Sequence, residues 1–250
     1  MDRAVLSELV PLPSEGRVFE QAFSAGFADC APSGRVRLDA VARWLQDVAY
    51  ADVVDAEVAD RAVWLVRRTR IRVARFPRVG EGCAVATFCS GLGRMWAERR
   101  TSVSALGSGE GQIEAVTLWV HLDPATWRPI PIGEEEASAY RPSTRGRRVS
   151  ARLRHPGPSW EEPRSIWSFR ATELDIAGHI NNAAYWEPLE EELLAGPELE
   201  RLDVELEYRA PAQPGEKQLL RDGTRRWIVG EQREVHASIL LADLEPPEAR

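Results

Sequence analysis

The sequence predicts an α+β protein in which two similar halves each lay one helix across a meander of antiparallel strands. Three observations lead to this prediction. A helix-period segment stands early in the chain, alternating segments follow it, and the second half repeats the same order of elements. An internal duplication would account for all three.

The first helix is predicted over residues 36–54. Its apolar residues recur with the i, i+3, i+4, i+7 spacing of one buried stripe. They are Leu38, Val41, Ala42, Leu45, Val48 and Ala49. Ser33 and Gly34, directly before the segment, supply a helix start signal.

Four strands are predicted to follow the helix. Residues 63–76 alternate with period two, which is typical of a strand with one buried and one solvent-exposed face. Thr69, Ile71 and Val73 form the buried face, and Arg68, Arg70 and Arg72 form the basic face. The later strands are expected at residues 83–95, 95–105 and 113–123, separated by turns that contain glycine or proline.

Residues 124–163 lose this periodicity, because proline, glycine and charged residues dominate there. We expect a linker with one short helix at EEEASAY. The second half then repeats the first. Residues 165–182 resemble a strand leading to a helix start, 201–216 echo the alternating strand at 68–81, and 217–244 supply further strands. The predicted units are an N-terminal extension (1–18), an N-terminal half (19–123), the linker (124–163) and a C-terminal half (164–250).

Composition narrows the function classes. The 250 residues are 44% hydrophobic and 28% charged, which is ordinary for a globular protein, and the net charge of −7 argues against a general nucleic-acid binder. No apolar run approaches the roughly 20 residues of a membrane helix, and no secretory signal is evident. The three cysteines have no metal-ligand spacing, so we expect free thiols, a cytoplasmic location and no metal. His121 and His236 are expected to be structural, and His155 to be solvated in the linker.

One motif stands out, TELDIAGHINNAAYWE at residues 172–187. Asp175 and His179 flank Gly178 and can converge on one pocket, where a carboxylate can orient water and an imidazole can share its proton. A helix starting there would offer N–H groups to an oxyanion, and Asn181 or Asn182 could cap it. Pro188 predicts a kink or a restart of that helix. The spacing alone also fits a plain helix cap, and only the strand–turn–helix context favours catalysis.

The motif resembles a known family. LDIAGHINNAAY is similar to the LD-x-N-x-HVNN-x-x-Y string of acyl-acyl-carrier-protein (acyl-ACP) thioesterases, which opens the central helix of their second hotdog domain. WLVRRTRIRVARFPRVGE, CSGLGRMWAERRTSV and LEYRAPAQPGE resemble other segments of that family in the same order, so that the resemblance covers roughly residues 19–243.

The resemblance implies two tandem hotdog domains and hydrolysis of fatty acyl-ACP thioesters without a metal or organic cofactor. It makes Asp175 and His179 the catalytic pair, with weaker support from Gly178, Asn181, Asn182 and Gln213. Two positions depart from the family. Ala177 replaces an asparagine, and near Pro211, where the plant enzymes have an acid, Gln213 is the nearest polar residue. The N-terminal half would bind the acyl chain, and Asp29 is taken as the degenerate counterpart of the motif.

The resemblance also implies a partner. Acyl carrier protein is acidic, so the basic residues around Arg68, Arg70 and Arg72 could steer its docking, although a strand surface also carries charge to resist edge pairing. Three alternatives stay open: an acyl-CoA thioesterase, a hydratase-like hotdog enzyme acting on a C=C bond, and a non-catalytic acyl-binding protein. Acyl chain length and association into a homodimer are not decided by the sequence.

Overall fold

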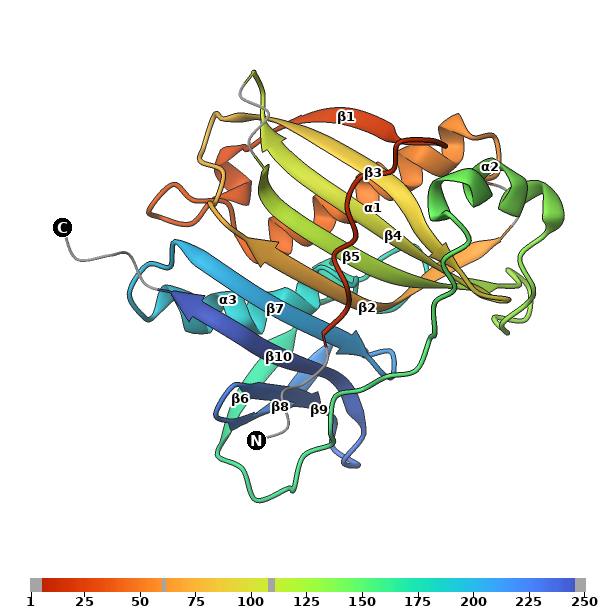
Figure 1. The fold of residues 1–250 in the computed structure, drawn as a ribbon. Helices are drawn as coiled ribbons and strands as arrows, with labels where there is room; N and C mark the ends of the chain where they lie inside the picture. Colours follow the sequence, from red (N-terminus) through yellow and green to blue (C-terminus); the bar gives the residue numbers. More distant parts are fainter. Residues whose placement is uncertain (1–5, 60–61, 108–110, 246–250) are drawn as a thin grey trace.

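The computed structural model describes residues 6–59, 62–107 and 111–245. Ten strands form one continuous sheet with the order β1-β3-β4-β5-β2-β7-β10-β9-β8-β6, and every neighbouring pair is antiparallel (Figure 1). Read from the two edges of the sheet inward, the orders are β1-β3-β4-β5-β2 and β6-β8-β9-β10-β7, which correspond strand by strand. The sheet therefore consists of two equivalent halves that meet where β2 pairs with β7.

The first half contains β1 (Phe19–Ser24), α1 (Leu38–Asp55), β2 (Val63–Val73), β3 (Gly82–Leu92), β4 (Trp96–Ala105) and β5 (Gly111–Leu122). After α2 (Glu134–Thr144), the second half contains β6 (Arg164–Phe169), α3 (Glu187–Leu194), β7 (Arg201–Tyr208), β8 (Gly215–Asp222), β9 (Arg225–Val229) and β10 (Val235–Glu245). The predicted order of elements is confirmed, including a helix at EEEASAY within the segment expected to be a linker.

Helix α1 lies against one face of the sheet, and its predicted apolar stripe is buried at all six positions from Leu38 to Ala49. One hydrophobic cluster contains five of these residues, all except Ala49, together with Phe169, Trp186 and Leu189 of the second half. The two halves therefore share one core.

The helix of the second half is much shorter than α1. After Asn182 the chain makes a 3-10 turn, Ala184–Trp186, before α3 begins at Glu187. Pro188 lies in the first turn of α3, where its missing N–H group removes no helical hydrogen bond. The predicted restart at Pro188 is confirmed, but the prediction that a helix opens directly after His179 is wrong.

The seam between the halves consists of two oppositely charged rows on the outer face of the sheet. In the β2–β7 register, Arg68, Arg70 and Arg72 lie opposite Glu207, Glu205 and Asp203. Arg70 Nε and Nη2 donate to the two oxygens of the Asp203 carboxylate, at 2.8 and 2.5 Å. Arg68 Nε lies 3.8 Å from Glu205 Oε2, and the Arg68 side chain is 2% exposed.

These positions correct one expectation from the sequence. The inward face of β2, with Thr69, Ile71 and Val73, is buried as predicted. The opposite face is not a free basic surface, because the acids of β7 pair with Arg68 and Arg70 and other segments cover them. The predicted alternation is confirmed, and Arg72 is exposed as expected, but the exposure predicted for Arg68 and Arg70 is wrong, because Arg68 is buried and Arg70 is half-buried.

The cover comes from the N-terminal segment, which crosses the outer face of the sheet in Figure 1. Ser7 N donates to Glu205 Oε2 at 2.7 Å, and Arg100 Nε donates to Val10 O at 2.9 Å. Helix α2 packs beside β3 on the same face, where Ser143 Oγ donates to Cys89 O at 2.9 Å. The charged side chains of Arg68, Glu205 and Glu207 are therefore enclosed by neighbouring segments of the same chain.

A second contact between the halves joins the two helices. Glu190 of α3 accepts a hydrogen bond from Leu38 N, the first residue of α1, at 3.0 Å. Its other oxygen lies 2.7 Å from Arg35 Nη2, and both side chains are 3% exposed. The Arg35 guanidinium also lies over the Phe76 ring at 4.8 Å. One carboxylate of the second half thus caps the long helix of the first.

We expect Glu190→Ala to lower the free energy of unfolding by about 3–5 kcal/mol, because it leaves the buried Arg35 without its anion. Urea titration followed by circular dichroism measures the change. Glu191→Gln, at the exposed neighbouring position on α3, is the matched control and should stay within about 0.5 kcal/mol of wild type. Equal losses in both variants would contradict a special role for Glu190.

Glu187 predicts a pH dependence of stability. Burial, followed by the nearby charges of Glu173 and Asp39, raises its pKa from 4.5 to about 7. The protonated Glu187 carboxyl stabilises the folded chain, and this contribution to the free energy of unfolding is fully present below pH 4.5. It is lost as pH rises through about 7, because the unfolded chain releases the proton at a lower pH than the folded chain does. Glu187→Gln should therefore unfold like wild type at pH 4.5 but be more stable at pH 8, by about 1–3 kcal/mol. Urea midpoints at both pH values test this, and an equal offset at the two would contradict it.

Candidate active site

Asp175 and His179 lie at the two ends of one tight turn. Asp175 N donates to His179 O at 2.9 Å, and Gly178 N donates to Asp175 O at 3.0 Å. Gly178 has φ +71°, in the left-handed region that glycine adopts without a steric penalty. The Asp175 carboxylate accepts the Ala177 N–H at 2.9 Å, which holds one of its oxygens in place.

The loop between β7 and β8 holds this turn in place through hydrogen bonds. Ile180 N donates to Ala212 O at 3.1 Å, and Gln213 Nε2 donates to Gly178 O at 3.1 Å. Gln213 is exposed and, like Gly178, is not among the residues that line the neighbouring cavity. Both are part of the scaffold of the turn.

The two asparagines connect the turn to the first half of the chain. Asn181 Oδ1 accepts hydrogen bonds from Ala183 N at 2.9 Å and from Gln46 Nε2 at 3.1 Å. Asn182 Nδ2 lies 3.5 Å from Gln46 Oε1. Sequence reasoning missed Gln46, although it is a polar residue directly beside the buried stripe of α1. Asn182 and Gln46 both line the cavity.

Two buried tyrosines fix the segment that follows. Tyr185 Oη accepts the Ala212 N–H at 2.8 Å. Tyr208 Oη donates to Asn182 O at 2.9 Å and accepts from Trp186 Nε1 at 3.0 Å. Burial and then the charge of Asp175 raise the pKa of Tyr185 to about 12, so that this phenol stays neutral beside the carboxylate.

A cavity of about 620 Å³ lies between the turn, α1, the first residues of β2 and α2. Much of its wall is apolar, including Ala49, Val53, Leu92, Trp119, Leu122 and Ala137. Asp175 and His179 both line it. Among the described residues no hydrogen bond joins their side chains, and what they share is the cavity wall. A carboxylate and an imidazole therefore face an apolar space that both halves enclose.

The main chain after His179 does not form the helix N-terminus that was expected to bind an oxyanion. The N–H groups of Ala177, Gly178, Ile180 and Asn181 already donate to Asp175, Ala212 and Glu173. The α-helix begins only at Glu187. An oxyanion donor at the N-terminus of a helix beginning at His179 is therefore excluded by the geometry of this segment.

The first half contains the same turn with other residues at the positions of Asp175 and His179. A bridge pairs Cys30 with Val36, as another pairs Leu174 with Ile180, and Gly34 has φ +87° where Gly178 has +71°. Ala31 N donates to Arg35 O at 2.8 Å, matching the bond from Asp175 to His179. Ala31 and Arg35 are thus the counterparts of the proposed pair. Asp29 ends the preceding 3-10 turn as Glu173 does, so the expected equivalence of Asp29 with the motif is corrected by two positions.

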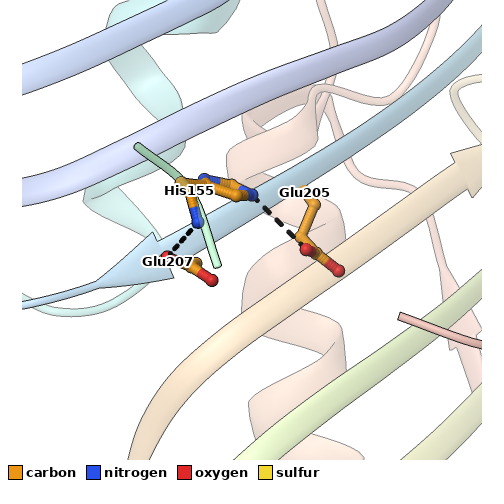
Figure 2. Close-up of side chains that lie close together, drawn as sticks. All are labelled: His155, Glu205 and Glu207. Carbon is orange, nitrogen blue, oxygen red and sulfur yellow. Dashed lines mark hydrogen bonds and ion pairs between the residues drawn. The ribbon is translucent and has the colours of Figure 1, made fainter. Parts of the chain in front are cut away.

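One further cluster has metal-ligating residue types, namely His155 with Glu205 and Glu207 of β7 (Figure 2). His155 is buried, so the expectation that it is solvated is wrong. Glu207 accepts the N–H groups of Arg154 and His155, at 2.5 and 3.1 Å, and Arg209 lies 3.2 Å from it. His155 Nε2 lies 3.4 Å from Glu205 Oε1. These carboxylates already have main-chain donors and cationic neighbours, so the cluster fits a clamp on the crossing segments better than a cation site.

The pKa of Glu205 is consistent with that role. Burial alone would raise it, but the hydrogen bonds from His155 and Ser7 and the charge of Arg68 outweigh burial and hold the pKa below its ordinary value. The ionised carboxylate is therefore the form that secures the N-terminal segment and the residues around His155.

Comparison with known proteins agrees with this geometry. Residues 16–140 match the acyl-ACP thioesterase N-terminal domain, and residues 160–228 match the acyl-ACP thioesterase C-terminal domain. The chain belongs to the acyl-ACP thioesterase family. It is accordingly an enzyme of the thioester hydrolase class, and its fold is the double hotdog.

One relative and two solved structures cover more than nine tenths of the chain, and a second relative covers 60% of it. An uncharacterized protein of Mycobacterium tuberculosis is 29% identical over 97% of this chain and 99% of its own length. The chloroplastic oleoyl-acyl carrier protein thioesterase of Coriandrum sativum is 24% identical over 60% of this chain and 44% of its own. An acyl-ACP thioesterase from Bacteroides thetaiotaomicron shares the fold with a TM-score of 0.77 at 18% identity, covering 91% of this chain and 98% of its own. The 12:0-ACP thioesterase from Umbellularia californica has a TM-score of 0.74 at 17% identity, covering 93% and 99%.

None of the helices in the described part of the chain is long and apolar enough to cross a membrane.

Proposed function

We propose that this enzyme hydrolyses fatty acyl thioesters of acyl carrier protein, releasing a free fatty acid and the carrier thiol. The observation that carries the proposal is that Asp175 and His179 both line a largely apolar cavity of about 620 Å³. Such a cavity suits an acyl chain, and the pair supplies a base and a proton donor at its wall.

In the proposed reaction, Asp175 orients water and takes its proton as the oxygen attacks the thioester carbon. The carbon–sulfur bond then breaks and the fatty acid forms. The proton that Asp175 took passes, with the assistance of His179, to the departing thiolate, which regenerates the carboxylate. The Ala177 hydrogen bond fixes one oxygen of Asp175 and leaves the other available to water. Since the Ala177 side chain is a methyl group, this position lacks the side-chain amide that the asparagine of the family would supply.

In the proposed reaction the two halves, at the predicted bounds of 19–123 and 164–250, have different roles. The first half supplies most of the acyl wall, and the second half supplies Asp175 and His179. Preference for the carrier protein rests on the family, because Arg68 and Arg70 are engaged in the seam and are not a free docking patch.

Asp175→Asn should lower kcat about 10²–10⁴-fold, because the amide can still accept the Ala177 N–H but cannot act as a base. His179→Ala should cause a loss of similar size. Hydrolysis is measured on matched acyl-ACP and acyl-CoA panels, with Glu173→Gln as a neighbouring control that retains its acceptor for Arg170 N. Faster turnover of the CoA series would favour an acyl-CoA thioesterase. Retention of acyl chains without any turnover would leave a binding protein.

Ala137→Phe, on the α2 wall of the cavity, should shorten the preferred acyl chain. Each methylene that can no longer be buried costs about 0.8 kcal/mol, or roughly fourfold in kcat/KM. The same panel of chain lengths gives the result. Ser138→Phe, at the next position on the exposed side of α2, is the control, and an unchanged chain-length profile in Ala137→Phe would contradict the assigned acyl path.

A further inference from the structure

We propose that Trp127 is a positioning residue for His179, holding the imidazole in its working orientation from the segment that connects the two halves of the chain. The inference rests on the proposed function. Trp127 lies between β5 and α2, in the segment expected to be a linker, and it lines the cavity. Its indole meets the His179 ring edge to face, with centroids 6.2 Å apart and an interplanar angle of 82°.

His179 needs such a restraint. In residues 6–59, 62–107 and 111–245, no hydrogen bond to the His179 ring is found, whereas His121 and His155 each have a partner at Nδ1. The contact with Trp127 is the ring interaction that the structure records for His179. Edge-to-face aromatic pairs favour defined geometries, so that the indole limits rotation of the imidazole about its side-chain bonds.

The backbone holds Trp127 in an unfavourable conformation. Its φ is +56°, in the left-handed region, which a bulky side chain rarely adopts. Asp123 secures the loop, because its carboxylate accepts the N–H groups of Ala125 and Thr126 at 3.0 and 2.7 Å, and its carbonyl accepts Trp127 N at 2.8 Å. Asp123 N in turn donates to Arg128 O at 3.0 Å. The surrounding bonds determine this conformation.

Core packing does not explain the position, since the Trp127 side chain is 43% exposed. An exposed tryptophan in a left-handed conformation gains little from burial, and strained residues of this kind cluster at functional sites. The indole lies at the cavity beside a proposed catalytic group. The alternative, that the indole only covers the substrate, predicts a change in KM and not in kcat.

The test compares Trp127→Ala and Trp127→Phe with Trp160→Ala. Trp160 is a matched control because it also has a positive φ, +74°, and one recorded ring contact, with Arg233 at 5.5 Å, but it is not a cavity residue. We expect Trp127→Ala to lower kcat about three- to tenfold with KM within about twofold, and Trp127→Phe to keep most of the rate. Trp127→Gly should lose rate while folding at least as stably, because glycine relieves the backbone.

A second readout does not depend on turnover. The chain has four histidines, so their ring resonances can be resolved by NMR and assigned with His179→Ala. Trp127→Ala should move the His179 ring resonances and leave the other three in place, and Trp160→Ala should leave His179 unchanged. Unmoved His179 resonances, an unchanged kcat, or a loss confined to KM would overturn the inference. Absence of wild-type turnover on every thioester would instead defeat the proposed function, while the resonances would still test the contact.

Discussion

The pairing of β2 with β7 is the constraint on which the rest of the molecule depends. It joins two five-stranded halves into one sheet and sets arginines of one strand against acids of the other, under the cover of the N-terminal segment. With the register fixed there, α1 can reach the turn through Gln46, and Trp127 can reach His179. The site is therefore a product of the seam, because its wall and its proposed reactive groups come from different halves.

Much of the fold could be predicted from the sequence, because each long element has a clear period. The stripe of α1 and the alternation of β2 reflect one-sided burial, and the duplication fixes the order of the remaining strands. The burial of Arg68 and the partial burial of Arg70 could not be predicted. A strand with outward arginines has the same pattern whether water or the acids of β7 lie opposite, and the choice depends on a partner more than 100 residues away.

The candidate site shows the same limit. Asp175 and His179 stand out because their spacing across a glycine brings two reactive groups into one short turn. Gln46 and Trp127 have no such signal, since a single polar residue beside a helical stripe and a single tryptophan in an irregular segment have many ordinary explanations. The left-handed backbone of Trp127 arises from hydrogen bonds to Asp123, which periodicity does not encode. The family motif predicts a helix that begins directly after His179, but a turn and a 3-10 segment come first, so that α3 begins only at Glu187.

The duplicated turn limits which substitutions the first half can tolerate. In the first half, the position matching His179 is Arg35, and Arg35 pairs with Glu190 between the two helices. Ala31→Asp and Arg35→His would place the residue types of Asp175 and His179 there but would leave Glu190 buried without its cation. Arg35 in the first-half turn thus has a structural role, and replacing it would weaken the contact between α1 and α3 that joins the two halves. The requirement for stability, and not the chemistry of the turn, would therefore oppose a second carboxylate–imidazole pair in the first half.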